Sequence, residues 1–230
     1  MNDDLTFSFQ GVHGAYSELA GKNLYPKSDS ISCSTFEEMF ESVRDKKSNV
    51  ALVPIENSQS GRVTDTQRLV PESKLKIIGE FFFEVNHCLL ALPGIKLNEV
   101  KKIHSHEQGI AQCRKNIIKN KKDMVIVADT AGAAKMISEL KNPEYAAIAS
   151  SLAAKIYNLD ILEKNFQDSE KNITRFLIMT NEFRMPDIIE SKIMTTLIFE
   201  LKSIPAALYK SLGGLASNGV NMTKLESYIN

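Results

Sequence analysis

The chain has 230 residues, of which 43% are hydrophobic and 24% are charged, an ordinary composition for a globular protein with a sizeable core. Its 28 basic residues balance its 28 acidic residues, so no global field favours nucleic acid or an anionic membrane surface. The acidic start lacks the features of a signal peptide, and no apolar run approaches the ~20 residues of a membrane span. We therefore expect a cytoplasmic protein without nucleic-acid or membrane partners.

The cysteines are three in number and widely spread, at Cys33, Cys88 and Cys113. The four histidines are scattered, and neither residue type shows a CxxC or HxxxH spacing. This pattern fits a reducing compartment better than a disulfide framework or a zinc site. We expect no metal.

The chain opens with a strand pattern, because residues 5–9 alternate between apolar and polar side chains. Gly11 and Gly14 follow, before a helix expected to start near Ala15. Such a turn can point backbone N–H groups at an anion, although its spacing is not the GxGxxG of a dinucleotide site. A tight turn and an anion site both stay open, and Ser17 is either functional or a first-turn polar residue.

The second strand-and-helix unit leads to a polar cluster. Residues 35–38 (Thr-Phe-Glu-Glu) form a capping-box pattern ahead of an amphipathic helix. A fully apolar strand follows at 50–53, and Glu56, Asn57 and Ser58 come just behind it. Open α/β sheets bind ligands at the carboxyl ends of their strands. Turn chemistry explains Asn57 and Ser58 equally well.

Residues 77–92 form the longest extended stretch, and its polar interruption predicts a crossing between two lobes. Another strand ends at Ser105, ahead of a helix expected over 107–119. His106 would lie at the start of this helix and Gln112 one turn further on. His106 is a general acid–base candidate, but a supporting hydrogen bond is the commoner role of a histidine at a helix start.

The following strands, expected at 124–128 and 145–149, again alternate with helices, the first of which is capped by Asp129. This alternation predicts an α/β fold with substantially parallel sheets. A last strand is expected from Thr174 into the apolar run that follows, with Arg175 beside it. Arginine offers a planar fork suited to a carboxylate, and threonine offers a compact donor and acceptor.

The tail changes character. Residues 181–192 contain Pro186 and many charges, which predicts a linker. A strand at 196–201, a helix opened by Pro205 and a further strand from 220 to 225 would begin a βαβ module without completing its sheet. We expect an incomplete C-terminal module.

Five of these stretches together resemble the prephenate dehydratase family. They occur in the family's order between residues 5 and 180. They are Gly14-Ala15-Tyr16-Ser17-Glu18, Pro54-Ile55-Glu56-Asn57-Ser58, Ser105-His106-Glu107-Gln108 through Gln112-Cys113, Asp129-Thr130-Ala131-Gly132-Ala133-Ala134, and Asn172 to Phe176.

The resemblance implies a fold like that of type-2 periplasmic binding proteins, with prephenate in a cleft between two lobes. Residues 1–182 would form this domain, with one lobe built from about 1–84 plus 166–182 and the other from about 85–165. The family converts prephenate to phenylpyruvate, losing water and carbon dioxide, without a cofactor. The matching positions imply a catalytic role for Thr174 and substrate-binding roles for Asn57, Ser105, Gln112, Arg175, Glu56 and Ser17, with Glu56 also a candidate proton source.

The tail resembles the start of an ACT domain, a βαββαβ module that binds amino-acid effectors. Residues 183–193 would be the linker and 194–230 a partial ACT domain. The resemblance implies L-phenylalanine as a candidate effector and a homo-oligomer, either dimer or tetramer. The candidate effector contacts are Ala207, Leu208, Glu226 and Ser227. Ala206 stands where the ACT motif usually has glycine. This departure argues against feedback by phenylalanine.

Two alternatives stay open. Arogenate dehydratase differs only in an amino group on the substrate side chain. A non-catalytic, amino-acid-sensing protein could use the same lobes and tail. The joint presence of the five motif residues favours an enzyme; they are Thr174, Arg175, Asn57, Ser105 and Gln112.

Overall fold

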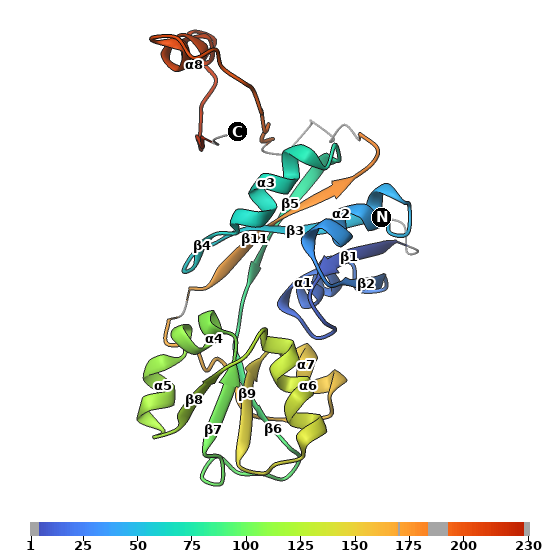
Figure 1. Cartoon of the computed structure of the whole chain (residues 1–230), viewed down its shortest axis with the longest axis vertical. Helices are drawn as coiled ribbons and strands as arrows, with labels where there is room; N and C mark the ends of the chain where they lie inside the picture. The colour runs from blue at the N-terminus through green and yellow to red at the C-terminus, as the bar shows by residue number, and fades with distance from the viewer. Residues whose placement is uncertain (1–4, 170, 184–192, 228–230) are drawn as a thin grey trace. The chain divides into compact units, whose positions relative to one another are not determined.

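The computed structural model describes residues 5–169, 171–183 and 193–227. The chain forms two compact units, Met1–Asp187 and Ile188–Asn230. The first unit contains two α/β lobes, each built on its own sheet (Figure 1). The expected bilobed α/β fold is confirmed, although both sheets are mixed rather than mainly parallel.

The first lobe is a six-stranded sheet in the order β2-β1-β3-β11-β5, with β4 beside β3. The strands β1, β2 and β3 are parallel, whereas β11 runs antiparallel to both β3 and β5. Its elements are β1 (Thr6–Gln10), α1 (Tyr16–Leu24), β2 (Asp29–Cys33), α2 (Phe36–Arg44), β3 (Val50–Asn57), β4 (Gly61–Arg62), α3 (Thr64–Glu72), β5 (Lys76–Glu84) and β11 (Ile173–Thr180).

Apolar clusters cover both faces of this sheet, which explains the unbroken apolar run at the start of β3. Ala51 and Val53 pack with α2 on one face, while Val50 and Leu52 pack with β1 residues on the other. Successive side chains of a strand point to opposite faces. A strand covered on both sides must therefore be apolar at every position.

The second lobe is a five-stranded sheet in the order β10-β6-β9-β7-β8. Two apolar clusters rich in alanine, leucine and isoleucine cover its faces. Its elements are β6 (Cys88–Ala91), β7 (Lys102–Ser105), α4 (Glu107–Gln112), α5 (Arg114–Lys119), β8 (Asp123–Ile126), α6 (Thr130–Leu140), β9 (Tyr145–Ala149), α7 (Ser151–Ile156) and β10 (Asp160–Glu163).

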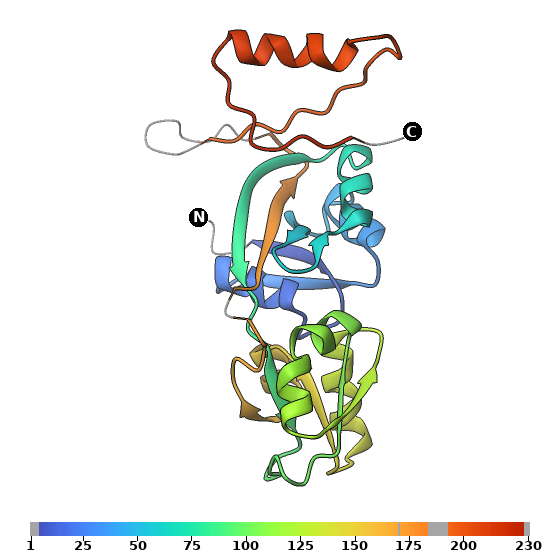
Figure 2. The same cartoon turned by 90° about the vertical axis from the view of Figure 1, so that its left-hand side faces the viewer.

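Two segments connect the lobes, one leaving β5 and one returning to β11 (Figures 1 and 2). They hydrogen-bond to each other, since Val85 N donates to Asn172 O (2.7 Å) and Phe166 N donates to His87 O (2.8 Å). The expected crossing is confirmed, and residues 85–87 mark where the chain changes sheets. The connection between the lobes is thus a pair of segments tied together by backbone hydrogen bonds.

Two helices expected from the sequence are present but differ in detail from the prediction. Thr35 Oγ1 accepts from Glu38 N (3.1 Å), but Glu38 reaches back to Ser34 N (2.6 Å) rather than to Thr35 N. The helix expected over 107–119 is two short helices, because Cys113 between them leaves helical geometry (φ −115°, ψ 10°).

The described part of the second unit, residues 193–227, contains one helix, α8 (Ala207–Ser217), between two extended segments. The predicted strands at 196–201 and 220–225 are wrong for these residues, because neither has a ladder partner. An extended segment becomes a strand only through such hydrogen bonds. The described residues therefore do not form the sheet of an ACT module.

The start of α8 also differs from expectation. The helix begins at Ala207, so Pro205 precedes it rather than opening its first turn. Ala206 has φ 61° and ψ 15°, the left-handed region that glycine adopts without strain. The alanine at the position where the expected ACT motif has glycine therefore adopts a backbone geometry that favours glycine.

Within the part of the chain that the structure describes, no helix is both long enough and apolar enough to cross a membrane.

The contact between α1 and β1 gives a stability prediction. A Cβ atom on Gly21 would lie 2.2 Å from a ring atom of the fully buried Phe7. We expect Gly21→Ala to destabilise the first unit by about 1–3 kcal/mol through overpacking, measured as a lower Tm. The matched control is Gly213→Ala in α8, whose Cβ would meet no atom within 4 Å. An unchanged Tm in Gly21→Ala would contradict this packing.

Candidate active site

Asn57 and Thr174 face each other at the end of the β3–β11 ladder. They are direct cross-strand partners, so their side chains project from the same face of the sheet. Asn57 Nδ2 donates to Thr174 Oγ1 (2.9 Å). Thr174 is 9% exposed, and because its oxygen accepts from Asn57, its own proton is left to donate elsewhere.

The hydrogen bonds continue from this pair into the second lobe. Asn57 Nδ2 also donates to Asn172 Oδ1 (2.7 Å), and Asn172 Nδ2 donates to Gln112 Oε1 (2.9 Å). The same oxygen lies 2.7 Å from His87 Nε2, and His87 Nδ1 lies 2.6 Å from the hydroxyl of Tyr16. We call these six residues, Tyr16, His87, Gln112, Asn172, Asn57 and Thr174, the interlobe chain.

A cavity of about 400 Å³ opens between the lobes. Tyr16 belongs to both the cavity wall and the interlobe chain. The N-terminus of α1 lines the cavity and has no side-chain cap, so its N–H groups favour an anion there. The lining residues are Gln10, Gly11, Val12, Ala15, Tyr16, Ser17, Ser32, Ser34, His106, Asp129 and Thr130.

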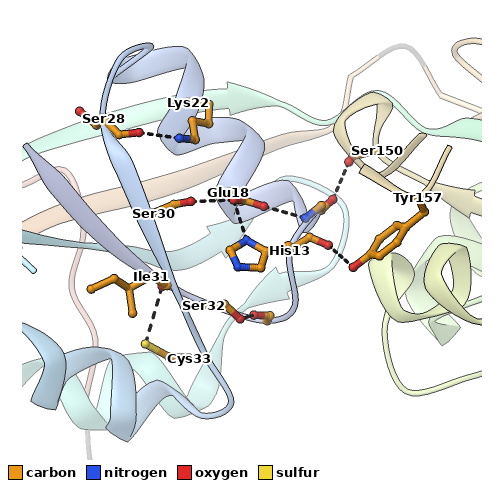
Figure 3. A network of polar contacts seen from close by, with 12 residues as sticks. His13, Glu18, Lys22, Ser28, Ser30, Ile31, Ser32, Cys33, Ser150 and Tyr157 are labelled. Carbon is orange, nitrogen blue, oxygen red and sulfur yellow. Dashed lines mark hydrogen bonds and ion pairs between the residues drawn. The ribbon is translucent and has the colours of Figure 1, made fainter. Parts of the chain in front are cut away.

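The glycine loop in this wall is held from both lobes. Glu18 is 3% exposed and accepts from Gly14 N (2.7 Å) and from His13 Nδ1 (2.9 Å). From the second lobe, the Tyr157 hydroxyl donates to His13 O (2.6 Å) and Ser150 Oγ donates to Gly14 O (2.5 Å) (Figure 3). Gly14 has φ +92°, and a Cβ there would lie 2.9 Å from the backbone of Ala153. Only glycine fits this loop so close to α7.

Burial shifts the pKa values of the two titratable residues of the interlobe chain, His87 and Tyr16, in opposite directions. It lowers the pKa of His87, partly offset by the hydrogen bond to Gln112, so the imidazole is neutral at pH 7. It raises the pKa of Tyr16, and the nearby Cys88 and Cys113 thiols add to this shift. Both groups are therefore uncharged.

Comparison with known proteins identifies the family. A family model described as prephenate dehydratase matches residues 7–184. The chain belongs to the prephenate dehydratase family. It is 44% identical over 232 residues to a bifunctional N-acyl-homoserine lactone acylase/prephenate dehydratase from Komagataeibacter europaeus, an alignment that covers all of this chain and 82% of that protein.

Two further relatives support the assignment. The chain is 38% identical to arogenate dehydratase 2 from Petunia hybrida, covering 97% of this chain but only 56% of that protein. It thus spans little more than half of the plant relative. A crystal structure of prephenate dehydratase from Arthrobacter aurescens in complex with L-Phe matches with a TM-score of 0.86 and 29% identity, over 97% of this chain and 76% of that one.

The structure brings three of the residues that the family resemblance implied into one place. Thr174, Asn57 and Gln112 all belong to the interlobe chain. Ser17 lies apart from them, in the cavity wall. His106 also lines the cavity, and its ring accepts from Gln108 N (3.3 Å) as the cap of α4.

The side chains of Arg175 and Glu56 do not lie on the same face of the sheet as Thr174. They are cross-strand partners on the opposite face of the sheet from Thr174. Arg175 Nη1 donates to Glu56 (3.0 Å), and its Nε donates to Glu80 (2.8 Å). The expectation of a guanidinium fork open to a substrate carboxylate is therefore not met here, and Glu56 is not placed to give a proton at Thr174.

Ser105 is likewise not at the cleft surface. It is fully buried at the end of β7, and its hydroxyl donates to Ile148 O (2.8 Å) on β9. The residue supports the sheet and the start of α4 rather than presenting a group to a ligand in this structure.

The candidate effector residues lie in the second unit. Ala207 begins α8, and Leu208 is 45% exposed. Glu226 forms an ion pair with Lys224 (3.1 Å), and Ser227 is exposed. Among the hydrogen bonds of the described residues, none joins these four residues into one cluster.

Three residues of the interlobe chain carried no functional assignment from the sequence: Tyr16, His87 and Asn172. Tyr16 and Asn172 lie inside motifs that were singled out, so a signal was available for them. His87 lies in the lobe crossing, and nothing in its local pattern marks it. Among the described residues, no group of three or more histidine, cysteine, aspartate or glutamate side chains is arranged to hold a metal.

Glu18 gives a prediction about pH. Burial alone would raise its pKa, but hydrogen bonds from Gly14 and then from Ser30 and His13 outweigh burial and hold the pKa below the ordinary 4.5. A lowered pKa in the folded state means that the carboxylate stabilises the protein above pH 4.5, and that this contribution disappears as pH falls through the folded-state pKa.

We expect Glu18→Gln to lower the free energy of unfolding at pH 7 by about 1–3 kcal/mol. The gap to the parent should narrow below pH 4.5, as urea titrations at several pH values would measure. The control is Glu72→Gln, because exposed Glu72 pairs only at the surface with Arg68 and should change stability by less than about 1 kcal/mol. A gap of equal size at low and neutral pH would contradict the role of Glu18.

Proposed function

We propose that this chain is a prephenate dehydratase, which converts prephenate to phenylpyruvate with loss of water and carbon dioxide. The observation that carries this proposal is the Asn57–Thr174 pair, joined by the interlobe chain to Tyr16 in the cavity wall, in a chain of the prephenate dehydratase family. Among the residues implied by the family resemblance, we propose Thr174 as catalytic, Asn57 and Gln112 as its supports, and Ser17 as a substrate contact. Arg175, Glu56 and Ser105 would act through the structure around the site.

The chemistry fits these residue types. Prephenate carries two carboxylates and a ring hydroxyl, and the loss of carbon dioxide and water creates an aromatic ring. The reaction thus needs a place for a dianion and help for the departing hydroxide. The uncapped N-terminus of α1 and the hydroxyls in the cavity wall supply donors for carboxylates.

Thr174 would act on the leaving oxygen. Its oxygen accepts from Asn57, so its proton can be directed at the departing hydroxyl. A threonine hydroxyl is a weak acid, so we favour positioning and electrostatic stabilisation over full proton transfer. A well-placed donor of this kind is worth about 3 kcal/mol in the transition state.

Two further activities follow from the relatives. Arogenate dehydratase is the alternative that the Petunia hybrida relative supports, because arogenate differs from prephenate by one amino group. The Komagataeibacter europaeus relative also carries an N-acyl-homoserine lactone acylase activity in its name, and it aligns with the whole of this chain. We therefore treat acylase activity as a second candidate function.

A substrate panel separates these functions. The purified chain, without added metal or nucleotide, would be given prephenate, arogenate and an N-acyl-homoserine lactone in parallel. We expect the highest kcat/KM for prephenate, measured as phenylpyruvate formation. A higher value for arogenate, or hydrolysis of the lactone alone, would replace the proposal. No turnover of any substrate by the folded chain would favour a binding protein.

We propose L-phenylalanine as an effector, because the Arthrobacter aurescens relative was crystallised with it. Adding it to the same assay, with L-alanine as the control ligand, measures any effect on turnover.

We also propose that residues 1–182 form the catalytic domain, that 183–193 link it to a partial ACT domain at 194–230, and that the chain forms a homo-oligomer. A cytoplasmic location fits the three cysteines, which are all free and buried.

Thr174→Ala tests the catalytic assignment. We expect kcat to fall by about 10²–10³-fold, because the donor to the leaving oxygen is lost. The matched control is Thr180→Ala at the other end of β11, where the hydroxyl donates to Asn49 O (2.9 Å) far from the cleft. Thr174→Ser should keep more activity than Thr174→Ala. Near-parental kcat in folded Thr174→Ala would remove Thr174 from the mechanism.

A further inference from the structure

The direction of each hydrogen bond in the interlobe chain follows from the groups involved. Gln112 Oε1 can only accept, so the facing His87 Nε2 must carry a proton (2.7 Å). A neutral imidazole then has an unprotonated Nδ1, which accepts from the Tyr16 hydroxyl (2.6 Å). Tyr16 and His87 thus hold one tautomer in place.

The amides beyond His87 depend on this orientation. Gln112 Oε1 also accepts from Asn172 Nδ2, which turns Asn172 Oδ1 toward Asn57. Asn57 Nδ2 then serves both Asn172 and Thr174, while its Oδ1 accepts from the backbone N–H groups of Gln59 (2.9 Å) and Ser60 (2.9 Å). Turning any one amide over would set like groups against each other, which a buried site penalises.

We propose that Tyr16 and His87 are positioning residues, which fix the amides of Gln112, Asn172 and Asn57 so that Thr174 keeps its proton for the cleft. Neither residue needs to touch the reacting atoms. The catalytic consequence rests on the proposed function, but the tautomer and the hydrogen-bond directions do not.

The surroundings of His87 favour its neutral form. The residue is 3% exposed, and its backbone N donates to Gln167 Oε1 (2.8 Å). Tyr16 is the titratable group that is hydrogen-bonded to His87, and the thiols of Cys88 and Cys113 act on Tyr16. Of the charged groups, Lys164 acts on Cys88 and Asp168 acts on Cys113. Protonation would turn Nδ1 into a second donor and reverse the hydrogen bond with Tyr16.

The chain offers a matched control pair in the second lobe. His104 and Tyr145 have ring centroids 4.8 Å apart, compared with 5.2 Å for His87 and Tyr16. Burial lowers the pKa of His104 as it does that of His87. However, His104 Nδ1 faces Ala146 O (3.4 Å) and, among the residues that the structure describes, forms no hydrogen bond with the interlobe chain.

The first test is independent of activity. Nitrogen-15 NMR of the histidines in the full chain, with His87 assigned through His87→Gln, reports which ring nitrogen carries the proton. We expect His87 to be neutral and protonated on Nε2 between pH 6 and 8, and to stay so in Tyr145→Phe. In Tyr16→Phe we expect mixed tautomers and a higher pKa. A charged or Nδ1-protonated His87 at pH 7 in the parent would overturn the proposal.

The second test measures turnover of prephenate against pH. Tyr16→Phe should lower kcat about tenfold, the effect of one buried hydrogen bond to a functional group, with a smaller change in KM, and should move the acid limb of kcat to higher pH. Tyr145→Phe should leave kcat and this limb unchanged. His87→Gln, whose amide can still donate to Gln112, should retain more activity than His87→Phe.

The outcomes can be told apart. A parental kcat and pH profile in Tyr16→Phe would refute the positioning role even if the NMR result is as expected. A folded parent without prephenate turnover would refute the proposed function, and the NMR measurement would then still decide the tautomer.

Discussion

The pairing of β3 with β11 is the constraint on which the rest of the structure depends. The strand β11 follows the whole second lobe in sequence, yet it completes the sheet of the first. Its register is set by apolar partners such as Val53 and Leu177, since a slip by one residue would move every side chain from one packed face of the sheet to the other. The ladder is irregular where Phe176 meets Pro54, a residue without an N–H to donate. Beyond that irregularity the register brings Asn57 opposite Thr174.

The same return of the chain explains why the site is built largely from amides. The connection between the lobes is buried enough that each polar group needs a partner. An amide both donates and accepts, so Asn57, Asn172 and Gln112 can satisfy one another across two lobes without carrying charge. A charged residue in their place would need a counter-ion in a low-dielectric setting. Neutral groups avoid this cost and leave the threonine proton unclaimed.

The sequence predicted what depends on neighbours along the chain and missed what depends on partners far away. The lobe crossing, the apolar strand at 50–53 and the Asp129 cap were all confirmed, because periodicity and capping are local. The contact between His87 and Gln112 joins residues 25 apart, and that between Asn57 and Asn172 joins residues 115 apart. No local pattern carries such information. The catalytic candidate Thr174 and the candidate substrate contacts Asn57 and Gln112 came from motifs, and only the fold showed that they meet.

The placement of Arg175 has a similar cause. Adjacent residues of a strand point to opposite faces, so Thr174 and Arg175, which are neighbours in the motif, project from opposite faces of this sheet. Arg175 instead lies between Glu56 and Glu80, one on each neighbouring strand, and these two ion pairs tie β3, β11 and β5 together. The guanidinium of Arg175 is thus engaged by these two carboxylates.

This arrangement suits the proposed reaction. If the substrate carboxylates are held by backbone N–H groups and hydroxyls rather than by a buried cation, their binding rests on fixed dipoles. The carboxylate that departs as carbon dioxide loses its charge in the transition state, so a strong ion pair to it would stabilise the ground state more and slow the step. Dipoles that bind this carboxylate weakly stabilise the ground state less. Thr174 would instead stabilise the charge that develops on the leaving oxygen in the transition state, which lowers the barrier.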